Sequence, residues 1–267
     1  MIMFASDLDR TLIYSKRALT EFKQYSESNL IGVEQKDGQE VAFMTNKAYD
    51  LLNVLASNLM FVPVTTRTYE QYKRIFILSD RMSLKYAVTS NGANIIYNGL
   101  PLLDWRNQVQ MRLEHECTSL EKMIVKTEQL EINGQLKQAE NLFFYYILEE
   151  ELTAERKDTI RKMADANGWR ISIQGRKLYL MPNPVSKGEA IKFIKDREGI
   201  HTVYGAGDSA LDYDFLKLCH YSYIPSHGEL VNEELNKDKY IITKKHGVQA
   251  GEELLSEMAN ILQETNI

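Results

Sequence analysis

IMFASDLDRT, residues 2–11, is the stretch that decides the fold of this chain. The apolar run Ile2–Phe4 leads into two carboxylates, Asp7 and Asp9. This pattern is typical of a buried strand that delivers acids to the carboxyl edge of a sheet. An extended strand would send the two side chains to opposite faces, so both can serve one metal ion only if the chain turns at once. The pair alone is equally compatible with a surface turn or a helix cap, so its meaning depends on the residues that follow.

The composition is that of a globular protein with room for one large domain or two smaller ones. The chain has 267 residues, of which 44% are hydrophobic. Its formal net charge is −5 and it has no block of Lys and Arg, which argues against nucleic acid as a partner. Cys117 and Cys219 are far apart and form no CxxC, which suggests neither zinc nor a disulfide. No run reaches the ~18 apolar residues of a membrane span, and no signal-peptide segment precedes Asp7, so we expect a cytoplasmic protein that does not bind membranes.

A hairpin is expected shortly after the first motif. Asp37-Gly38 separates the apolar runs Leu30–Val33 and Val41–Phe43, and this dipeptide is a strong hairpin signal. The hairpin would form a flap close above Asp7. Thr45 can cap the helix that follows it.

Two further strands end in polar residues. The apolar run Met60–Val64 ends in Thr65-Thr66-Arg67, and Tyr86–Thr89 stops at Ser90-Asn91-Gly92-Ala93. A helix is expected between them, over residues 69–78. Strands that alternate with helices in this way predict an α/β fold, a doubly wound, mostly parallel Rossmann-like sheet whose site lies at the carboxyl ends of its strands.

The periodicity changes over residues 102–182, where we expect an inserted α+β cap domain. The elements predicted there are a helix over 118–130, an aromatic strand over 143–148, a helix over 153–167 that Gly168 ends, and a hairpin of 169–174 with 177–181. Pro101 and Pro182-Asn183-Pro184 are expected to act as hinges. The core domain would then consist of residues 1–101 and 183–267.

The core resumes with a capping box, Ser186-Lys187-Gly188-Glu189, which places Lys187 in the first turn of a helix. Thr202–Tyr204 is a short strand that ends in Gly205-Ala206-Gly207-Asp208-Ser209. A helix over 210–218, strands over 221–224 and 240–242, and a helix over 248–262 complete the prediction.

The polar residues at these strand and helix ends form a set suited to phosphoryl transfer. In chain order they are Asp7, Asp9, Thr65, Lys187, Asp208 and Asp212. A phosphate monoester repels an anionic nucleophile, so its oxygens need positive charge and hydrogen-bond donors around them. Mg²⁺, bound by Asp7, Asp208 and the Asp9 backbone, would supply most of that charge. Lys187 would add a fixed cation and Thr65 a hydroxyl donor.

The reaction inferred is in-line attack by Asp7 on phosphorus, which gives an aspartyl-phosphate that water hydrolyses. Asp9 would protonate the leaving oxygen and then accept a proton from water. Asp212, four residues after Asp208, can point toward the metal or orient Lys187. It is also compatible with an ordinary acid at the start of a helix.

These motifs resemble the four ordered motifs of the haloacid dehalogenase (HAD) superfamily. They are Asp7-Leu8-Asp9-Arg10-Thr11, Thr65 before Arg67, Ser186-Lys187-Gly188, and Gly207-Asp208-Ser209 with Asp212. Within the superfamily the chain is similar to the Cof-type and sucrose-phosphatase-like phosphatases, whose cap is inserted between the second and third motifs. Ser90-Asn91-Gly92-Ala93 matches another segment of that group, and the likeness covers nearly the whole chain. It implies a magnesium-dependent phosphatase with Asp7 as nucleophile and Asp9 as acid and base.

Three residues depart from the family pattern. Arg10 stands where glycine is common, Thr66 replaces the usual glycine of the second motif, and Leu211 stands where asparagine is frequent. The first two leave the chemistry intact but can reshape the pocket, whereas Leu211 removes a polar group from the surroundings of the metal. The Tyr14–Phe43 segment is also longer than the usual connection and would narrow access to the site.

Substrate contacts are expected from both domains. The candidates are Leu8, Thr66, Arg67, Asn91 and Arg176. Gly175-Arg176, in the turn of the last cap hairpin, resembles a Gly-Arg segment of the sucrose-phosphatase-like relatives, so Arg176 would contact the leaving portion of the substrate. A solvated turn cation is the alternative for Arg176, and an ordinary turn residue is the alternative for Asn91.

The function predicted is hydrolysis of a small phosphorylated metabolite, with a sugar phosphate as a candidate. Phosphotransferase or phosphomutase chemistry, in which a bound alcohol accepts the phosphoryl group, is not excluded by the motifs. A non-catalytic phosphate-binding regulatory protein is a third interpretation, against which the intact Asp7 and Asp9 argue. We expect a monomer or a homodimer.

Overall fold

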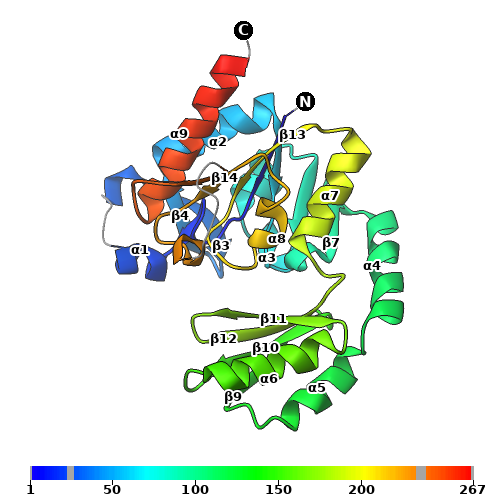
Figure 1. Ribbon diagram of the computed structural model, residues 1–267. Helices are drawn as coiled ribbons and strands as arrows, with labels where there is room; N and C mark the ends of the chain where they lie inside the picture. The colour runs from blue at the N-terminus through cyan, green and yellow to red at the C-terminus, as the bar shows by residue number, and fades with distance from the viewer. Residues whose placement is uncertain (1, 23–26, 233–238, 266–267) are drawn as a thin grey trace. The chain divides into compact units, whose positions relative to one another are not determined.

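The computed structural model describes residues 2–22, 27–232 and 239–265 (Figure 1). The chain forms two compact units, one of residues 1–101 and 187–267 and one of residues 102–186. In the described part of the chain, none of the helices is long and apolar enough to span a membrane. Residues 23–26 of the long segment expected over 14–43 lie outside the described residues.

The first unit is built on a parallel sheet of five strands in the order β15-β14-β13-β1-β5. The strands are β1 (Ile2–Ser6), β5 (Met60–Pro63), β13 (Thr202–Ala206), β14 (Tyr221–Ile224) and β15 (Tyr240–Ile242). β1 is an interior strand and pairs in parallel with both β13 and β5. Because parallel strands end at the same edge of a sheet, the residues that follow these three strands are brought together there. The predicted α/β fold with a mostly parallel sheet is confirmed.

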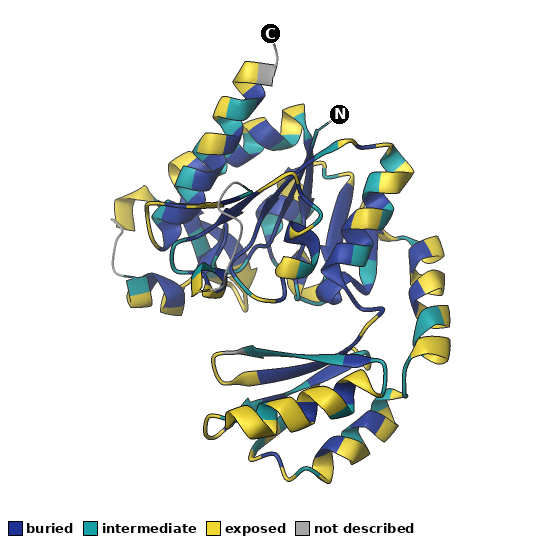
Figure 2. Ribbon diagram, in the orientation of Figure 1, coloured by how far each residue is buried: buried dark blue, intermediate teal, exposed yellow. Residues whose placement is uncertain are grey.

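Helices cover both faces of this sheet (Figure 1). They include α2 (Asn46–Asn58), α7 (Lys187–Glu198), α8 (Tyr213–Leu216) and α9 (Val248–Thr265). Phe4 of β1 belongs to the same buried cluster as Leu52 of α2 and Leu254 of α9. On the other face, a Cβ at Gly205 of β13 would collide with Leu216 of α8, which shows how closely that helix approaches. Figure 2 shows the buried strands between helices whose outer surfaces are exposed.

The hairpin predicted around Asp37-Gly38 is confirmed. It consists of β3 (Leu30–Lys36) and β4 (Gln39–Thr45). The short strand β2 (Tyr14–Ser15) pairs with β4. The helix α1 (Lys16–Phe22) and a 3-10 turn, η1 (Glu27–Asn29), precede the hairpin in the chain. Asp37 and Gly38 have φ angles of 51° and 76°. Two consecutive left-handed residues match the twist of the strands that they join. Thr45 caps α2 as predicted, because its side chain accepts the N–H of Ala48 at 3.0 Å.

The strand at residues 86–89 is not a member of the five-stranded sheet, contrary to the prediction. β6 (Tyr86–Thr89), β7 (Asn94–Tyr97) and β8 (Leu100–Pro101) form a separate antiparallel sheet. A single parallel bridge joins Val64, just after β5, to Val88 of β6. Pro63 has no N–H to donate to a ladder on that side, so β5 and β6 meet only beyond it.

The helix expected over residues 69–78 is wrong in extent. α3 (Tyr69–Lys73) ends early and a π-helix, η2 (Ile77–Arg81), follows. The helical pattern is interrupted at Arg74, whose carbonyl accepts the N–H of Gln35 in β3 at 3.0 Å. A backbone group that bonds outside the helix cannot continue its ladder.

The helix expected over residues 210–218 is also too long, because α8 covers only Tyr213–Leu216. The turn before it is organised by the carboxylate of Asp212, which accepts the N–H groups of Asp208 at 3.1 Å and Ser209 at 2.9 Å. A side chain that bonds the preceding backbone competes with helix formation, so the helix begins only after Asp212.

The second unit contains an antiparallel sheet in the order β11-β12-β10-β9. Its elements are α4 (Leu103–Glu116), α5 (Leu120–Glu128), β9 (Gly134–Ala139), β10 (Phe143–Leu148), α6 (Ala154–Asp165), β11 (Trp169–Gln174) and β12 (Lys177–Pro182). The aromatic strand, the hairpin and helices α5 and α6 are confirmed. The sequence pattern does not predict α4 or β9. α4 buries Trp105 and Val109 but leaves Leu103 and Met111 exposed, so its apolar residues do not mark one clear face.

Replacing Gly168 with alanine is expected to destabilise the second unit by about 2–3 kcal/mol. Gly168 follows α6 with φ 74°, and a Cβ there would collide with the backbone carbonyl of Glu116. Gly175→Ala is the matched control, because Gly175 has φ 53° but no atom within 4 Å of its Cβ position, and we expect it to cost about 1 kcal/mol. Both tryptophans, Trp105 and Trp169, lie in this unit, so urea unfolding followed by tryptophan fluorescence measures its stability directly. Equal losses of unfolding free energy in Gly168→Ala and Gly175→Ala would contradict the idea that the collision of a Cβ with the Glu116 carbonyl causes the destabilisation.

Candidate active site

The first motif leaves the sheet and turns at once, as a shared site for its acids requires. Asp7 directly follows β1, and its N–H donates to the carbonyl of Ala206 in β13 at 2.8 Å. The carbonyl of Leu8 then accepts the N–H groups of Leu12 and Ile13, both at 2.9 Å. The Leu8 side chain is fully buried, so only its backbone would be available for the substrate contact that the sequence predicts.

Lys187 lies between two carboxylates at this edge of the sheet. It is the first residue of α7 and is 1% exposed. Its Nζ donates to Asp7 Oδ1 at 2.7 Å and to Asp212 Oδ1 at 2.6 Å. Burial by itself would lower the pKa of Lys187, but the charges of Asp212 and Asp7 outweigh burial and raise it. Lys187 therefore stays charged and acts as a fixed cation beside Asp7.

Asp212 connects Lys187 to the loop that follows β13. While Oδ1 accepts from Lys187, Oδ2 accepts the N–H groups of Asp208 and Ser209 and the hydroxyl of Ser209, the last at 2.8 Å. The residue is fully buried and occupies the N-cap position of α8. Gly207 lies against it so closely that a Cβ there would stand 2.5 Å from Cβ of Asp212. The carboxylate thus orients Lys187 and fixes the loop that carries Asp208.

Three buried carboxylates converge beside Lys187 and could hold a metal ion. Oxygens of Asp7, Asp208 and Asp212 all lie within 4.8 Å of one another. Burial, followed by the charge of Asp212, raises the pKa of Asp7 to about 7, although Lys187 acts in the opposite direction. Burial and the charges of Asp7 and Asp212 likewise raise the pKa of Asp208. A cluster of oxygen donors with this excess of negative charge fits a hard divalent cation such as Mg²⁺.

Asp9 stands apart from that group and is held by Arg67. Arg67 Nε and Nη2 donate to the two oxygens of Asp9, each at 2.7 Å. The Asp9 side chain is 45% exposed, whereas that of Arg67 is 13% exposed. The two carboxylates of the first motif therefore have different surroundings, one paired with a buried lysine and the other with an arginine at the surface of the site.

The second motif and the segment after β6 are joined through the backbone. Thr65 is buried, its carbonyl accepts the N–H of Asn91 at 3.0 Å, and its Oγ1 accepts the N–H of Arg67 at 3.1 Å. Asn91 has φ 56° and is buried as well, so it serves the turn while lying next to Thr65. Thr66, which follows Thr65 in the chain, is partly exposed.

Arg10 occupies a left-handed backbone conformation, which favours glycine. Its φ is 63°. Its guanidinium donates to Glu21 at 3.0 and 3.1 Å, and its Nε lies 3.8 Å from Asp208 Oδ2. His227 Nε2 donates to the Arg10 carbonyl at 2.8 Å while its Nδ1 accepts the N–H of Gly247 at 3.1 Å. Burial lowers the pKa of His227 to about 4, so the imidazole is a neutral support for this turn.

Leu211 and Arg176 lie in different units of the chain. Leu211 is buried and contributes to packing. Arg176 belongs to the second unit, where its Nε donates to the carbonyl of Leu148 at 2.8 Å. Glu34, which contacts Arg67, and Arg74, which contacts Glu34, were not predicted, because nothing in the sequence distinguishes them from other charged residues.

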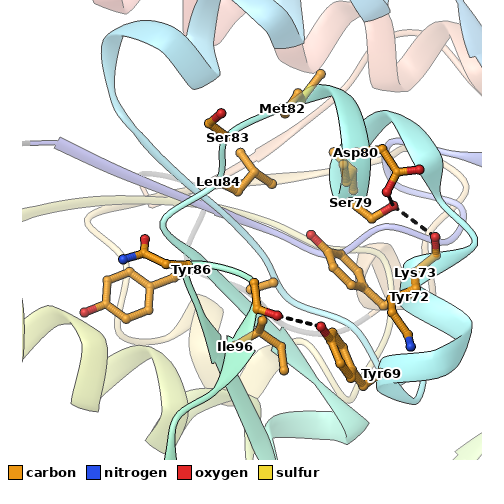
Figure 3. Close-up of a pocket in the computed structure, with 14 residues that line it drawn as sticks. Tyr69, Tyr72, Lys73, Ser79, Asp80, Met82, Ser83, Leu84, Tyr86 and Ile96 are labelled. Carbon is orange, nitrogen blue, oxygen red and sulfur yellow. Dashed lines mark hydrogen bonds between the residues drawn. The ribbon is translucent and has the colours of Figure 1, made fainter.

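A cavity of about 460 Å³ lies elsewhere in the first unit (Figure 3). Its walls come from α3, η2, β6 and β7, and Tyr69 and Ser79 are held there by bonds to the carbonyls of Gly99 and Lys73. Asp80 is the carboxylate among its lining residues. The cavity thus offers no convergent group of acids comparable to the cluster around Lys187.

Comparison with known proteins finds a family model that covers most of the chain and solved structures that are similar over nearly all of it. The family model described as sucrose-6F-phosphate phosphohydrolase matches residues 1–237. The sucrose-phosphatase of Synechocystis, solved in complex with sucrose and phosphate, is similar with a TM-score of 0.71 and 15% identity over 97% of both chains. A haloacid dehalogenase-like hydrolase of Bacillus subtilis has a TM-score of 0.56 and 17% identity over 98% of this chain and 90% of that one. The phosphatase BT1666 of Bacteroides thetaiotaomicron has a TM-score of 0.57 and 13% identity over 97% and 94%. At these identities the structural likeness is one of fold, and no curated protein matches the chain.

Proposed function

The chain belongs to the sucrose-6F-phosphate phosphohydrolase family of HAD-type phosphatases, and on this premise we propose that it hydrolyses a sugar phosphate with the help of Mg²⁺ through an aspartyl-phosphate. The observation that carries the proposal is the position of Lys187, buried between Asp7 and Asp212 at 2.7 and 2.6 Å. A buried cation beside a buried carboxylate is what a nucleophile needs in order to approach a phosphate dianion.

In this reaction, a carboxylate oxygen of Asp7 forms a bond to phosphorus as the bond between phosphorus and the leaving oxygen breaks. Asp9 gives a proton to that oxygen, so an alcohol departs. Water then attacks the phosphorus of the aspartyl-phosphate and gives its proton to Asp9, which releases inorganic phosphate and restores both acids. The charge of Lys187 stabilises the phosphoryl oxygens in both steps, and the Thr65 hydroxyl is an additional donor.

Magnesium, when bound, would neutralise the charge that accumulates on the phosphoryl oxygens. Its protein ligands would be Asp7, Asp208, Asp212 and the backbone carbonyl of Asp9. Support comes from the buried cluster of Asp7, Asp208 and Asp212, whose mutual repulsion a divalent cation would relieve.

The family and the Synechocystis relative, which was solved with sucrose, support a sugar phosphate as substrate. We propose that residues 102–182 act as the cap that selects it, and that Arg176 contacts the leaving portion. Leu8, Thr66, Arg67 and Asn91 would contribute to the phosphate side of the pocket. Arg176 is already bonded to Leu148, so its contact with substrate would use the guanidinium nitrogens other than Nε.

The proposal is tested by measuring phosphate release by the purified protein with Mg²⁺, and again after EDTA treatment and restoration of Mg²⁺. The substrates are sucrose 6F-phosphate, trehalose 6-phosphate, glucose 6-phosphate, a nucleoside monophosphate and p-nitrophenyl phosphate. We expect release that EDTA abolishes and Mg²⁺ restores, with the highest kcat/KM for one of the sugar phosphates. Release that is indifferent to EDTA would overturn the metal requirement, and preference for the nucleotide would overturn the substrate class.

A further inference from the structure

Glu34 is a buried acid outside the four motifs. It lies in β3 of the hairpin and is 3% exposed. A carboxylate at this depth is retained in a fold only where cations or donors compensate it. Its surroundings therefore show what the hairpin contributes to the site.

A β-bulge turns Glu34 inward. The register of β3 against β4 shifts on both sides of Glu34, between Gly32 and Glu34 and between Glu34 and Gln35. Successive residues of a regular strand point to opposite faces, yet Val33 and Glu34 are both buried. Bulges of this kind re-aim a side chain next to functional sites. The bulge also directs the N–H of Gln35 to the carbonyl of Arg74, which ties the hairpin to the segment after the second motif.

Inside the bulge, Glu34 is paired with two arginines. Its Oε1 lies 2.9 Å from Nη1 of Arg67 and 3.2 Å from Nη2 of Arg74. Arg67 meets Glu34 with one nitrogen and holds both oxygens of Asp9 with two others. Because a guanidinium is planar and rigid, an ion pair that attracts one of its nitrogens also restrains the direction of the other two.

We propose that Glu34 is a positioning residue that, through Arg67, holds the Asp9 carboxylate in place to transfer a proton to the leaving oxygen. This inference rests on the proposed role of Asp9. The Asp9 side chain is nearly half exposed, so without Arg67 it would be free to change rotamer. Without Glu34, Nη1 of Arg67 would face a buried position that holds no carboxylate. Arg67 would then shift away from Asp9. The inserted hairpin thus supplies an indirect part of the catalytic machinery.

The experiment compares two substrates whose leaving groups differ in whether they need a proton from the enzyme. An alkoxide leaving from a sugar phosphate needs a proton, whereas p-nitrophenolate is weakly basic and leaves without one. kcat/KM reports the steps up to formation of the aspartyl-phosphate, in which Asp9 acts as the acid. We expect Glu34→Gln to lower kcat/KM by about 10-fold or more for the best sugar phosphate and by less than about 3-fold for p-nitrophenyl phosphate.

Two controls separate positioning from a general structural effect. Glu40→Gln makes the same substitution on the facing strand of the hairpin, where the side chain is exposed. It should leave kcat/KM unchanged for both the sugar phosphate and p-nitrophenyl phosphate. In an Asp9→Asn background, Glu34→Gln should cause no further loss with the sugar phosphate, because its effect passes through Asp9. Equal losses for both substrates, an additive loss in the Asp9→Asn background, or no loss at all would overturn the inference.

Arg67→Lys covers the case in which Glu34→Gln does not fold. Lysine keeps the charge but cannot hold two oxygens of Asp9 and meet Glu34 at the same time, so the same selective loss is expected. Absence of turnover by the wild-type protein would count against the proposed function, whereas an active wild type with unselective losses would count only against the role of Glu34.

Discussion

Asparagine in place of Asp7 is expected to abolish phosphate release, with kcat lowered by about 10⁴-fold or more. An amide oxygen does not form the bond to phosphorus that the carboxylate forms. The shape of the side chain is preserved, and the asparagine oxygen can still accept the bond that Lys187 donates to Asp7 Oδ1 at 2.7 Å. The loss would therefore reflect the chemistry of residue 7 alone.

A measurement of thermal stability distinguishes a loss of catalysis in Asp7→Asn from a loss of folding. Burial and the charge of Asp212 raise the pKa of Asp7 to about 7, so the ionised carboxylate is not a favourable group in the free protein. Removing its charge should leave the thermal midpoint unchanged or raise it. An Asp7→Asn variant that melts well below the wild type would contradict this expectation.

The intermediate gives a second readout of the same prediction. Borohydride reduces an acyl phosphate to an alcohol, so treating the wild-type enzyme during turnover should convert residue 7 to homoserine, which peptide mass spectrometry detects. Asp7→Asn should yield none. Homoserine at another aspartate would assign the nucleophile elsewhere, and undiminished phosphate release by the variant would rule out Asp7.

Glutamine in place of Lys187 is expected to lower kcat/KM by about 10³-fold. Two unit charges about 4 Å apart interact by roughly 4 kcal/mol at an effective dielectric near 20, which corresponds to about three orders of magnitude in rate. Lys187 also opposes the rise in the pKa of Asp7, so its loss would leave Asp7 protonated at neutral pH. Lys192→Gln, an exposed lysine on the same helix, is the matched control and should keep full activity.

The stability of the Lys187→Gln variant should depend on pH. Removing one member of a buried ion pair costs about 3–5 kcal/mol when the remaining charge stays ionised. The pKa of Asp7 is about 7 in the folded wild type and rises further without Lys187, so as the pH falls toward about 7 the folded variant binds a proton on Asp7 that neither the folded wild type nor the unfolded chain binds. The deficit relative to wild type should therefore shrink toward acid pH, as urea unfolding at several pH values would measure. A deficit that grows toward acid pH would contradict the assigned pairing.

Local sequence was informative wherever one short segment contains the whole signal. Asp37-Gly38 predicted the hairpin turn because two left-handed residues are needed there. Thr45 predicted the start of α2 because the capping side chain and the N–H group that it accepts lie only three residues apart in the chain. α4 was missed because its apolar residues do not form one face, so the pattern that identifies a helix is absent.

The predicted pattern failed at three elements, each for an identifiable hydrogen-bonding reason. α3 ends where Arg74 bonds Gln35, and α8 begins late because Asp212 bonds the turn before it. β6 lies outside the main sheet because Pro63 removes a donor from β5. In the first two cases one hydrogen-bonded contact shortens a helix, and in the third a missing N–H ends a ladder; hydrophobic periodicity registers none of these.

The sequence by itself predicted an α/β protein, because polar residues follow its apolar strands, and its four ordered motifs resemble those of the HAD superfamily. It also determined which residues are candidates for the chemistry. Only the tertiary structure decided their distances, since Lys187 and Asp7 meet at 2.7 Å although 180 residues separate them. It likewise decided the pairing of Arg67 with both Asp9 and Glu34. The physical reason is that strand order and a bulge in the hairpin, neither of which has a local signature, choose which distant charges become neighbours.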